Sequence, residues 1–212
     1  MLKKIALPCI SIFLFCACSL KMPEFPSFGK KDDSAILEKA NVCQKIEDMD
    51  NKLFCYRKIL NENSYAQLRM GTYSVEKKDY KKAIEYLNQS IHNKNPYANL
   101  PLAFLYYKGE GVDKDLDKAF KLLSDSSDVD PNAAYQLSRF YLQGINTKVD
   151  TKKGIDLLEF AASKNMLVAQ LMLVNIYKEG TFSQEKDAKK VKYWEDIIKK
   201  DVRDENFDIY KI

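Results

Sequence analysis

Two cysteines near the start of the chain are the residues whose type and spacing most readily suggest chemistry. Cys43 lies in SAILEKANVCQKIEDM and Cys55 in NKLFCYRKIL, and the spacing of apolar residues predicts a helix for each segment. Asp48, Asp50 and Asn51 mark a turn between the two helices. Such a hairpin would let the two sulfurs form a disulfide, which contributes about 2 to 3 kcal/mol for so short a loop. Two buried free thiols are the alternative, and a cysteine nucleophile would in addition need a base partner.

Other reactive groups form no recognisable arrangement. The single histidine, His92, ends a helical segment beside NKNP, and we expect it on the surface rather than as a general base. No two metal ligands stand at a usable spacing, the acidic residues are spread over charged faces, and Trp194 is expected in the core. The sequence therefore predicts no catalytic residue, no metal site and no cofactor.

The N-terminus has the pattern of a secretory signal peptide. Lys3 and Lys4 give a positive start, and about eleven mostly apolar residues follow from Ile5 to Phe15. A helix that spans a bilayer needs about 20 such residues, whereas the apolar core of a signal peptide has roughly 7 to 15. We expect residues 1–17 to be removed.

The junction that follows resembles the lipobox of bacterial lipoproteins. There, diacylglycerol is attached to the sulfur of the first mature cysteine before cleavage, and here Ala17 directly precedes Cys18. The usual box has an aliphatic residue at minus three and a small residue at minus two, where this chain has Phe15 and Cys16. The resemblance implies acylation of Cys18, and Ser19 after it implies an anchor in the outer membrane, facing the periplasm. A plain signal peptide without lipid is the alternative.

Composition argues against a nucleic-acid binder. The formal net charge of +4 falls to about +2 without Lys3 and Lys4, and basic and acidic residues are interspersed. Residues 18–33 carry two prolines and one glycine without helical periodicity, which is typical of a flexible spacer between lipid and domain. From Ala35 onward the chain is helical in character, beginning with the hairpin at 34–62.

The rest of the chain repeats itself with a period of 35 to 36 residues. In three successive units a tyrosine precedes a glycine by three positions, and an alanine and a leucine recur in step. The matching residues are Tyr106, Tyr141 and Tyr177; Gly109, Gly144 and Gly180; Ala98, Ala133 and Ala169; and Leu102, Leu137 and Leu173. This period predicts stacked helical hairpins, because one hairpin cannot bury its own apolar face.

The pattern resembles the Sel-like repeat, a 36-residue relative of the tetratricopeptide repeat with the consensus Ala-x3-Leu-Gly-x2-Tyr-x2-Gly-x-Gly-Val-x2-Asp-x2-Lys-Ala. Residues 98–119 follow it at Ala98, Leu102, Tyr106, Gly109, Gly111, Val112, Asp115, Lys118 and Ala119. The second unit keeps Asp150 and Lys153 but has Gly154 in place of the inner alanine. The third has one extra loop residue and carries Trp194.

An upstream unit is closer to the tetratricopeptide form, with Gly71, Asp79, Tyr80 and Ala83. The resemblance covers about residues 63–200 and implies an all-α fold, a right-handed solenoid of stacked antiparallel hairpins whose first helices line the concave face. The hairpin at 34–62 would cap it, and 201–212 would form a C-terminal tail. The stretch GEGVDK is then a turn, since a phosphate-binding loop needs a preceding strand and a Lys-Ser/Thr ending.

The resemblance implies a binding protein rather than an enzyme. We expect a non-enzymatic, lipid-anchored scaffold whose groove holds an envelope protein or an extended peptide during assembly of a secretion, polysaccharide-export or motility machine. Cysteine-rich Sel-like proteins that bind or hydrolyse β-lactams are one alternative, but their repeats each carry a disulfide pair and no cysteine follows Cys55 here. A peptidoglycan-associated modulator of a wall enzyme is another.

Groove positions carried over from tetratricopeptide repeats predict where a partner binds. The alignment places Gly71, Ala103, Ser138 and Val174 at the small residue of each first helix. The predicted groove residues are Tyr65, Thr72, Tyr97, Phe104, Tyr107, Tyr135, Arg139, Asn175 and Lys178. Tyrosine and arginine are over-represented among interface hot spots, so we expect a docking strip. The alternative is that the rings only pack against the neighbouring hairpin.

Overall fold

The computed structural model describes residues 31–200 and 208–212, with side chains from residue 34 onward. The predicted signal peptide, Cys18 and most of the predicted spacer lie outside the described residues. Within the described ranges every regular element is a helix: α1 (Lys31–Gln44), α2 (Met49–Ile59), α3 (Ser64–Glu76), α4 (Tyr80–His92), the short 3-10 helix η1 (Pro96–Ala98), α5 (Asn99–Lys108), α6 (Leu116–Ser124), α7 (Pro131–Gln143), α8 (Thr151–Ser163), α9 (Leu167–Glu179) and α10 (Ala188–Lys200). The all-α prediction is confirmed.

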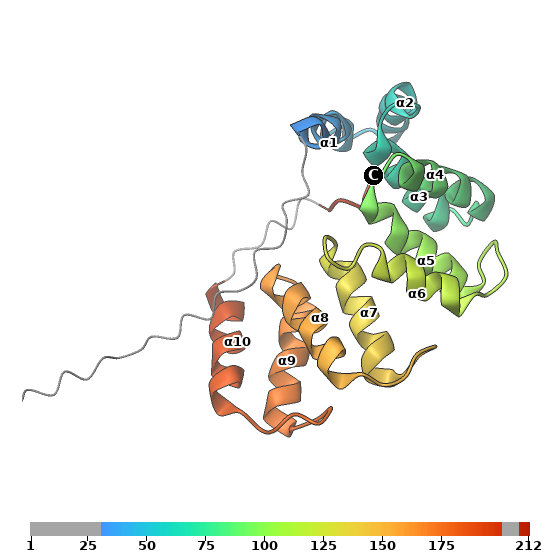
Figure 1. Ribbon diagram of the computed structural model, residues 1–212. Coiled ribbons are helices and arrows are strands. Elements are labelled where there is room, and N and C mark those ends of the chain that lie inside the picture. The colour runs from blue at the N-terminus through green and yellow to red at the C-terminus, as the bar shows by residue number, and fades with distance from the viewer. Residues whose placement is uncertain (1–30, 201–207) are drawn as a thin grey trace, which may run out of the picture.

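Consecutive helices pair into hairpins, and the hairpins stack into a solenoid. α1 pairs with α2, α3 with α4, α5 with α6, α7 with α8 and α9 with α10, and each hairpin also contacts the next. Figure 1 shows the pairs following an arc from α1 and α2 to α10, with the C-terminal end of the chain beside α3 and α5 rather than beside α10. The end of the chain therefore returns to the first half of the array.

The sequence pattern has a direct counterpart at the turn inside each repeat. α5, α7 and α9 each end at a glycine with a φ of 67 to 75°, a left-handed conformation that costs little only for glycine. An aspartate N–H then donates to the carbonyl of the repeat tyrosine; the pairs are Asp115 with Tyr106, Asp150 with Tyr141, and Asp187 with Tyr177. Tyrosine and aspartate are nine residues apart in the first two units and ten in the third. The predicted extra loop residue is confirmed.

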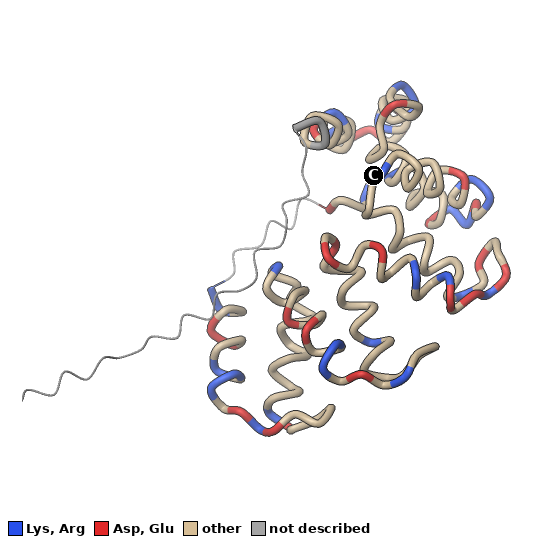
Figure 2. The backbone as a smooth tube through the Cα atoms, viewed as in Figure 1, with Lys and Arg blue, Asp and Glu red and all other residues tan. Residues whose placement is uncertain are grey.

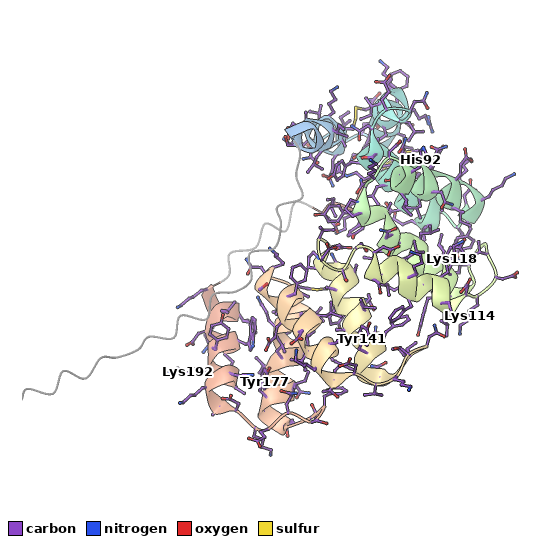
Figure 3. All side chains as sticks on the ribbon, viewed as in Figure 1. His92, Lys114, Lys118, Tyr141, Tyr177 and Lys192 are labelled. Atoms are coloured by element: carbon purple, nitrogen blue, oxygen red, sulfur yellow. A yellow bond between two sulfur atoms is a disulfide. The ribbon has the colours of Figure 1, made fainter. Side chains whose placement is uncertain are left out.

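A lysine from the second helix of each unit lies over the ring of the repeat tyrosine. The Nζ atoms lie 4.1 to 5.3 Å from the ring centroids, in the pairs Lys118 with Tyr106, Lys153 with Tyr141, and Lys190 with Tyr177. In Figure 3, Tyr141 and Tyr177 extend from equivalent parts of α7 and α9. Such pairs contribute about 0.5 to 1 kcal/mol at exposed sites. The consensus tyrosine and lysine therefore hold the two helices of a unit together.

Small residues let the helices of a hairpin approach closely. Ala83, Ala98, Ala119 and Ala133 are fully buried. At Gly154 in α8, a Cβ atom would lie 2.6 Å from the side chain of Leu142 in α7. Large apolar side chains fill the spaces around these contacts, and Trp194 is buried among them at 6% exposure. The prediction that Trp194 belongs to the core is confirmed.

The first hairpin is closed by a disulfide. Cys43 in α1 and Cys55 in α2 are bonded through their sulfurs, with their Cα atoms 5.5 Å apart. Cys43 packs with Ala40, Leu53 and Tyr56 in the core of this end of the array. The pairing predicted from the two helical segments is the one that the structure contains.

Charge is distributed without a basic stripe. Figure 2 shows Lys and Arg interleaved with Asp and Glu along the described helices and turns. The ion pairs, such as Lys152 with Asp156 at 3.0 Å, lie at exposed positions. Exposed pairs contribute roughly 0 to 1 kcal/mol, so packing rather than salt bridges stabilises the solenoid.

Candidate partner-binding groove

The last five residues of the chain occupy part of the inner face. We name the residues around them the tail site: Gln44, Arg69, Thr72, Tyr97 and Asp130. Ile209 and Tyr210 pack against the core between α3, α4 and α5, and Ile212 packs against the core of the first hairpin. The segment thus joins units that lie far from it in the sequence.

The tail site binds the backbone of this segment. Four consecutive carbonyl oxygens accept hydrogen bonds from three side chains. Gln44 Nε2 donates to the carbonyls of Asp208 and Lys211, both at 3.0 Å. Arg69 Nε donates to Ile209 at 3.2 Å, and the Thr72 hydroxyl donates to Tyr210 at 2.5 Å.

The segment itself folds into a turn. The N–H of Tyr210 donates to Oδ1 of Asp208 at 2.9 Å, and the N–H of Lys211 donates to the carbonyl of Asp208 at 3.2 Å. These two N–H groups are thereby satisfied within the segment. Its carbonyl oxygens face the side-chain donors of the tail site, so the two surfaces are complementary.

A side-chain hydrogen bond of Tyr210 links the segment to the N-cap of α7. The Tyr210 hydroxyl donates to Oδ2 of Asp130 at 2.5 Å, and Asp130 Oδ1 accepts from the N–H of Asn132 as the N-cap of α7. Asp130 is fully buried, and burial raises the pKa of its carboxyl despite these hydrogen bonds. Burial and the neighbouring Asp130 also raise the pKa of the Tyr210 hydroxyl. The rings of Tyr210 and Tyr97 pack edge to face, with centroids 6.4 Å apart.

Arg69 holds the tail site to the first hairpin. It is 0% exposed, and its guanidinium donates to the Tyr56 hydroxyl at 3.2 Å and to Asn41 Oδ1 at 2.7 Å, besides Ile209. Burial raises the pKa of Tyr56, an effect that the Arg69 cation opposes. All three acceptors of Arg69 are neutral. A buried cation with such partners is costly to place unless each hydrogen bond is made, so the segment at 208–212 contributes to its satisfaction.

A second feature of the inner face is an open hollow between α5 and α7. We name it the aromatic pocket. Its volume is about 100 Å³, and it is lined by Ala103, Phe104, Tyr107, Leu123, Gln136, Arg139, Phe140 and Ile145. The rings of Tyr107 and Phe140 lie 5.8 Å apart, and Phe104 and Tyr107 are each 37% exposed. Arg139 Nη1 donates to Gln136 Oε1 at 3.1 Å, which fixes its position at the rim.

The tail site and the aromatic pocket are built from equivalent positions of successive repeats. The small residues Gly71, Ala103 and Ser138 are buried at matching places in α3, α5 and α7. One residue further on, Thr72 contacts the tail, whereas Phe104 and Arg139 line the pocket. The repeat register therefore puts both features along one groove.

The predicted groove residues divide into three groups. Tyr65, Thr72 and Tyr97 gather at the tail, where the rings of Tyr65 and Tyr97 lie 6.4 Å apart. Phe104, Tyr107 and Arg139 share the aromatic pocket.

The remaining three lie elsewhere. Tyr135 is half-buried and packs against the core around α8 and α9, so it supports the fold as well as the surface. Asn175 and Lys178 are exposed on α9, and Lys178 borders a separate hollow against α10.

Sequence reasoning missed the residues of the tail site that come from other elements. Gln44, Arg69 and Asp130 were absent from the predicted strip, as were residues 208–212. An arginine within the otherwise uncharged stretch YAQLRMGTY of α3 was the available signal for Arg69. The apolar and aromatic side chains of DIYKI were the signal for a tail that packs rather than hangs free.

His92 is exposed at the end of α4, as predicted. No group of three or more His, Cys, Asp or Glu side chains is placed to hold a metal ion in the part of the chain that the structure describes. None of the helices between residues 31 and 200 is long and apolar enough to cross a membrane.

Comparison with known proteins identifies the repeats. The Sel1 repeat family matches residues 64–95, 96–127 and 131–166. The upstream unit, closer by sequence to the tetratricopeptide form, is thus matched as a Sel1 repeat. The hairpin of α9 and α10 lies beyond the matched residues and keeps the same glycine, aspartate and lysine geometry.

Two solved structures share the fold. A Sel1 repeat protein from Oxalobacter formigenes superposes with a TM-score of 0.70 at 22% identity, over 79% of this chain and 73% of that one. The protective antigen c5321 of uropathogenic Escherichia coli, described as displaying an SLR fold, gives a TM-score of 0.61 at 21% identity, over 80% of this chain and 39% of that one.

Two curated proteins match shorter stretches. The alginate biosynthesis protein AlgK of Pseudomonas syringae pv. tomato is 32% identical over 102 residues, which is 48% of this chain and 22% of AlgK. The HRD3B component of an ERAD-associated E3 ubiquitin-protein ligase of Arabidopsis thaliana is 39% identical over 57 residues, which is 27% of this chain and 9% of HRD3B. This chain therefore spans less than a quarter of either relative. Residues 64–95, 96–127 and 131–166, which form the hairpins from α3 to α8, are therefore matched as Sel1 repeats.

Proposed function

We propose that this protein is a non-enzymatic scaffold, tethered through lipid on Cys18 to the outer membrane of a bacterial envelope, whose inner groove holds another envelope protein. The observation that carries the proposal is the aromatic pocket. Phe104, Tyr107 and Arg139 converge there from two successive repeats.

The size and lining of the aromatic pocket suit a side chain of a protein partner. Small-molecule sites have volumes of roughly 300 to 1,000 Å³, several times the 100 Å³ of this pocket. Aromatic residues and arginine dominate interface hot spots, and Phe104 and Tyr107 are exposed despite their apolar rings. A partner that inserts one apolar side chain would remove both rings from water while Arg139 binds its polar groups.

The match with AlgK favours one kind of assembly among those considered. AlgK is an alginate biosynthesis protein, and the match lies in a chain that forms its groove from Sel1 repeats. We therefore place machinery for making or exporting an envelope polysaccharide ahead of secretion and motility machines. The match with HRD3B, from a component of a ubiquitin ligase, supports the coarser role of a repeat scaffold within a complex.

Site-specific photo-crosslinking in the native cell tests the groove. A photoreactive phenylalanine analogue replaces Tyr107 in the pocket or, as the control, Tyr193 on α10, which is 58% exposed. We expect one discrete crosslinked species from position 107, weakened by Arg139→Ala and absent from position 193. Equal crosslinking from both positions, or none from 107, would contradict the proposal.

The lipid anchor has a separate test. Intact-mass analysis of the purified protein should show a chain that begins at Cys18 and carries acyl groups, and Cys18→Ser should abolish both the acyl groups and the cleavage before residue 18. A mature protein without lipid would refute the anchor and leave the groove proposal standing.

A further inference from the structure

We infer that the tail site is a recognition site for a peptide turn of the form Asp-aliphatic-Tyr-x-aliphatic, and that residues 208–212 occupy it as an internal competitor of a partner protein that presents the same turn. The inference rests on the proposed function, because it names the chemistry of a partner and how access to the groove is controlled.

The tail site has the donor arrangement of a peptide receptor. Gln44, Arg69 and Thr72 project from α1 and α3. Their hydrogen bonds to the segment go to backbone carbonyl oxygens, four bonds for four consecutive carbonyls. Contacts of this kind recognise the shape of a backbone turn and not the side chains that it carries. Any chain that adopts the turn can make them.

Selectivity comes from Asp130 and the apolar surroundings. Asp130 Oδ2 accepts from the Tyr210 hydroxyl, and the rings of Tyr210 and Tyr97 pack edge to face. A peptide with phenylalanine in place of this tyrosine would leave the fully buried Asp130 carboxylate without one hydrogen-bond donor. Such a peptide should therefore bind more weakly. Ile209 and Ile212 fill apolar contacts on either side, so aliphatic residues are preferred before the tyrosine and two positions after it.

The turn depends on an aspartate two residues before the tyrosine. Asp208 accepts from the N–H groups of Tyr210 and Lys211, and its carboxylate lies 3.6 Å from the Lys211 ammonium. The Asp208 carbonyl accepts from both Lys211 and Gln44, and the turn leaves the carbonyls of Ile209, Tyr210 and Lys211 available to the site. Replacement of the aspartate removes the side-chain bond that presets the turn, so it raises the entropic cost of binding.

The occupant belongs to the same chain and is short. Intramolecular tethering gives it a high effective concentration, which raises the affinity that a partner needs in order to displace it. A partner with more contacts along the groove, for example in the aromatic pocket, can overcome that advantage. The segment therefore favours partners that also contact the rest of the groove over partners that bind the tail site alone.

Peptide binding to purified full chains tests the inference. The probe is a synthetic Asp-Ile-Tyr-Lys-Ile peptide with an N-terminal fluorophore, followed by fluorescence polarisation. The proteins are the wild type, Tyr210→Phe, Tyr210→Ala and the control Tyr193→Ala. Weakening the internal segment should raise the affinity for the probe in the order wild type, Tyr210→Phe, Tyr210→Ala, with about tenfold or more between the first and the last. Tyr193→Ala should equal the wild type.

Variants of the probe and of the site complete the experiment. A probe with phenylalanine in place of tyrosine should bind Tyr210→Ala about tenfold more weakly, and Thr72→Val added to Tyr210→Phe should weaken the original probe. If Tyr210→Ala does not fold, the difference in probe affinity between the wild type and Tyr210→Phe still tests the inference.

Three outcomes would overturn the inference: equal affinity of the probe for wild type and Tyr210→Phe, no binding to any folded variant, or a wild-type dimer that dissociates in Tyr210→Phe, which would assign the site to tail exchange between copies. Crosslinking from position 107 together with failure of the probe would leave the proposed scaffold function intact and remove only this inference.

Discussion

Replacing Gly154 with alanine separates what the repeat pattern implies from what the packing allows. The consensus has alanine here, and alanine is favoured over glycine by about 1 kcal/mol inside a helix, so the pattern alone predicts stabilisation. In the structure, a Cβ at this position would lie 2.6 Å from both Cγ and Cδ2 of Leu142 and 3.2 Å from the carbonyl oxygen of Ser138. Leu142 is only 4% exposed, so the leucine cannot swing into solvent.

The net effect follows from these opposing contributions. Overpacking of a close-packed contact costs about 1 to 3 kcal/mol, and the gain in helix propensity offsets about 1 kcal/mol of it. We expect Gly154→Ala to lower the free energy of unfolding by roughly 1 kcal/mol, which corresponds to about 2 to 4 °C in Tm for a chain of this size.

A double-mutant cycle measured by urea unfolding and circular dichroism gives the decisive comparison. Leu142→Ala alone should cost about 2 to 5 kcal/mol. In that background the new Cβ meets no leucine, so Gly154→Ala should stabilise by about 1 kcal/mol, which makes the coupling roughly 2 kcal/mol. Stabilisation of the wild type by Gly154→Ala, or a coupling near zero, would refute the claim that α7 and α8 are held at a distance that only glycine permits.

Three further predictions concern the two ends of the groove. Reduction of the Cys43–Cys55 disulfide should lower the free energy of unfolding by about 3 kcal/mol, as measured by urea unfolding with and without reductant; an unchanged midpoint would contradict it. Because the pKa of Asp130 is raised in the folded state, its contribution to stability is complete below its ordinary value of 3.8 and is lost as the pH rises through the raised pKa. The stability of the wild type relative to Asp130→Asn should therefore fall over that interval in unfolding series at several pH values, and parallel profiles would contradict the assignment. Tyr107→Ala and Arg139→Ala should weaken partner crosslinking several-fold with a change in Tm below about 2 °C, because their side chains lie at the rim of the pocket; early melting of both would show that they support the fold.

The sequence predicted those parts of the structure that the repeat determines. The spacing of Tyr106, Tyr141 and Tyr177 was sufficient because each tyrosine contacts residues of its own unit, so local register fixes its neighbours. The disulfide was predictable for the same reason, since Cys43 and Cys55 are only 12 residues apart in one hairpin.

The tail site could not be predicted in this way. Gln44 and Asp208 are 164 residues apart, so no local pattern in the sequence indicates their contact. For Tyr135, the sequence predicted the position in the repeat but not the burial of the side chain. The register placed it on a first helix, but whether a side chain packs inward or faces the groove depends on the neighbouring unit. The sequence therefore predicted which positions of the repeat face the groove, but not whether the side chain at such a position is buried or lines the groove.

The return of the chain end to the first units has a mechanical consequence. In an array whose repeats contact only their neighbours, bending is shared among independent interfaces and unfolding can begin at either end. Here the bond from Gln44 to Asp208 and the bond from Tyr210 to Asp130 fasten the segment that follows the last hairpin to α1 and α7. The part of the solenoid from α1 to α7 is thereby held by a link other than the contacts between neighbouring hairpins. The two ends of this part should lose hydrogen-exchange protection together rather than one after the other. Breaking the two hydrogen bonds would let it bend as easily as an ordinary solenoid.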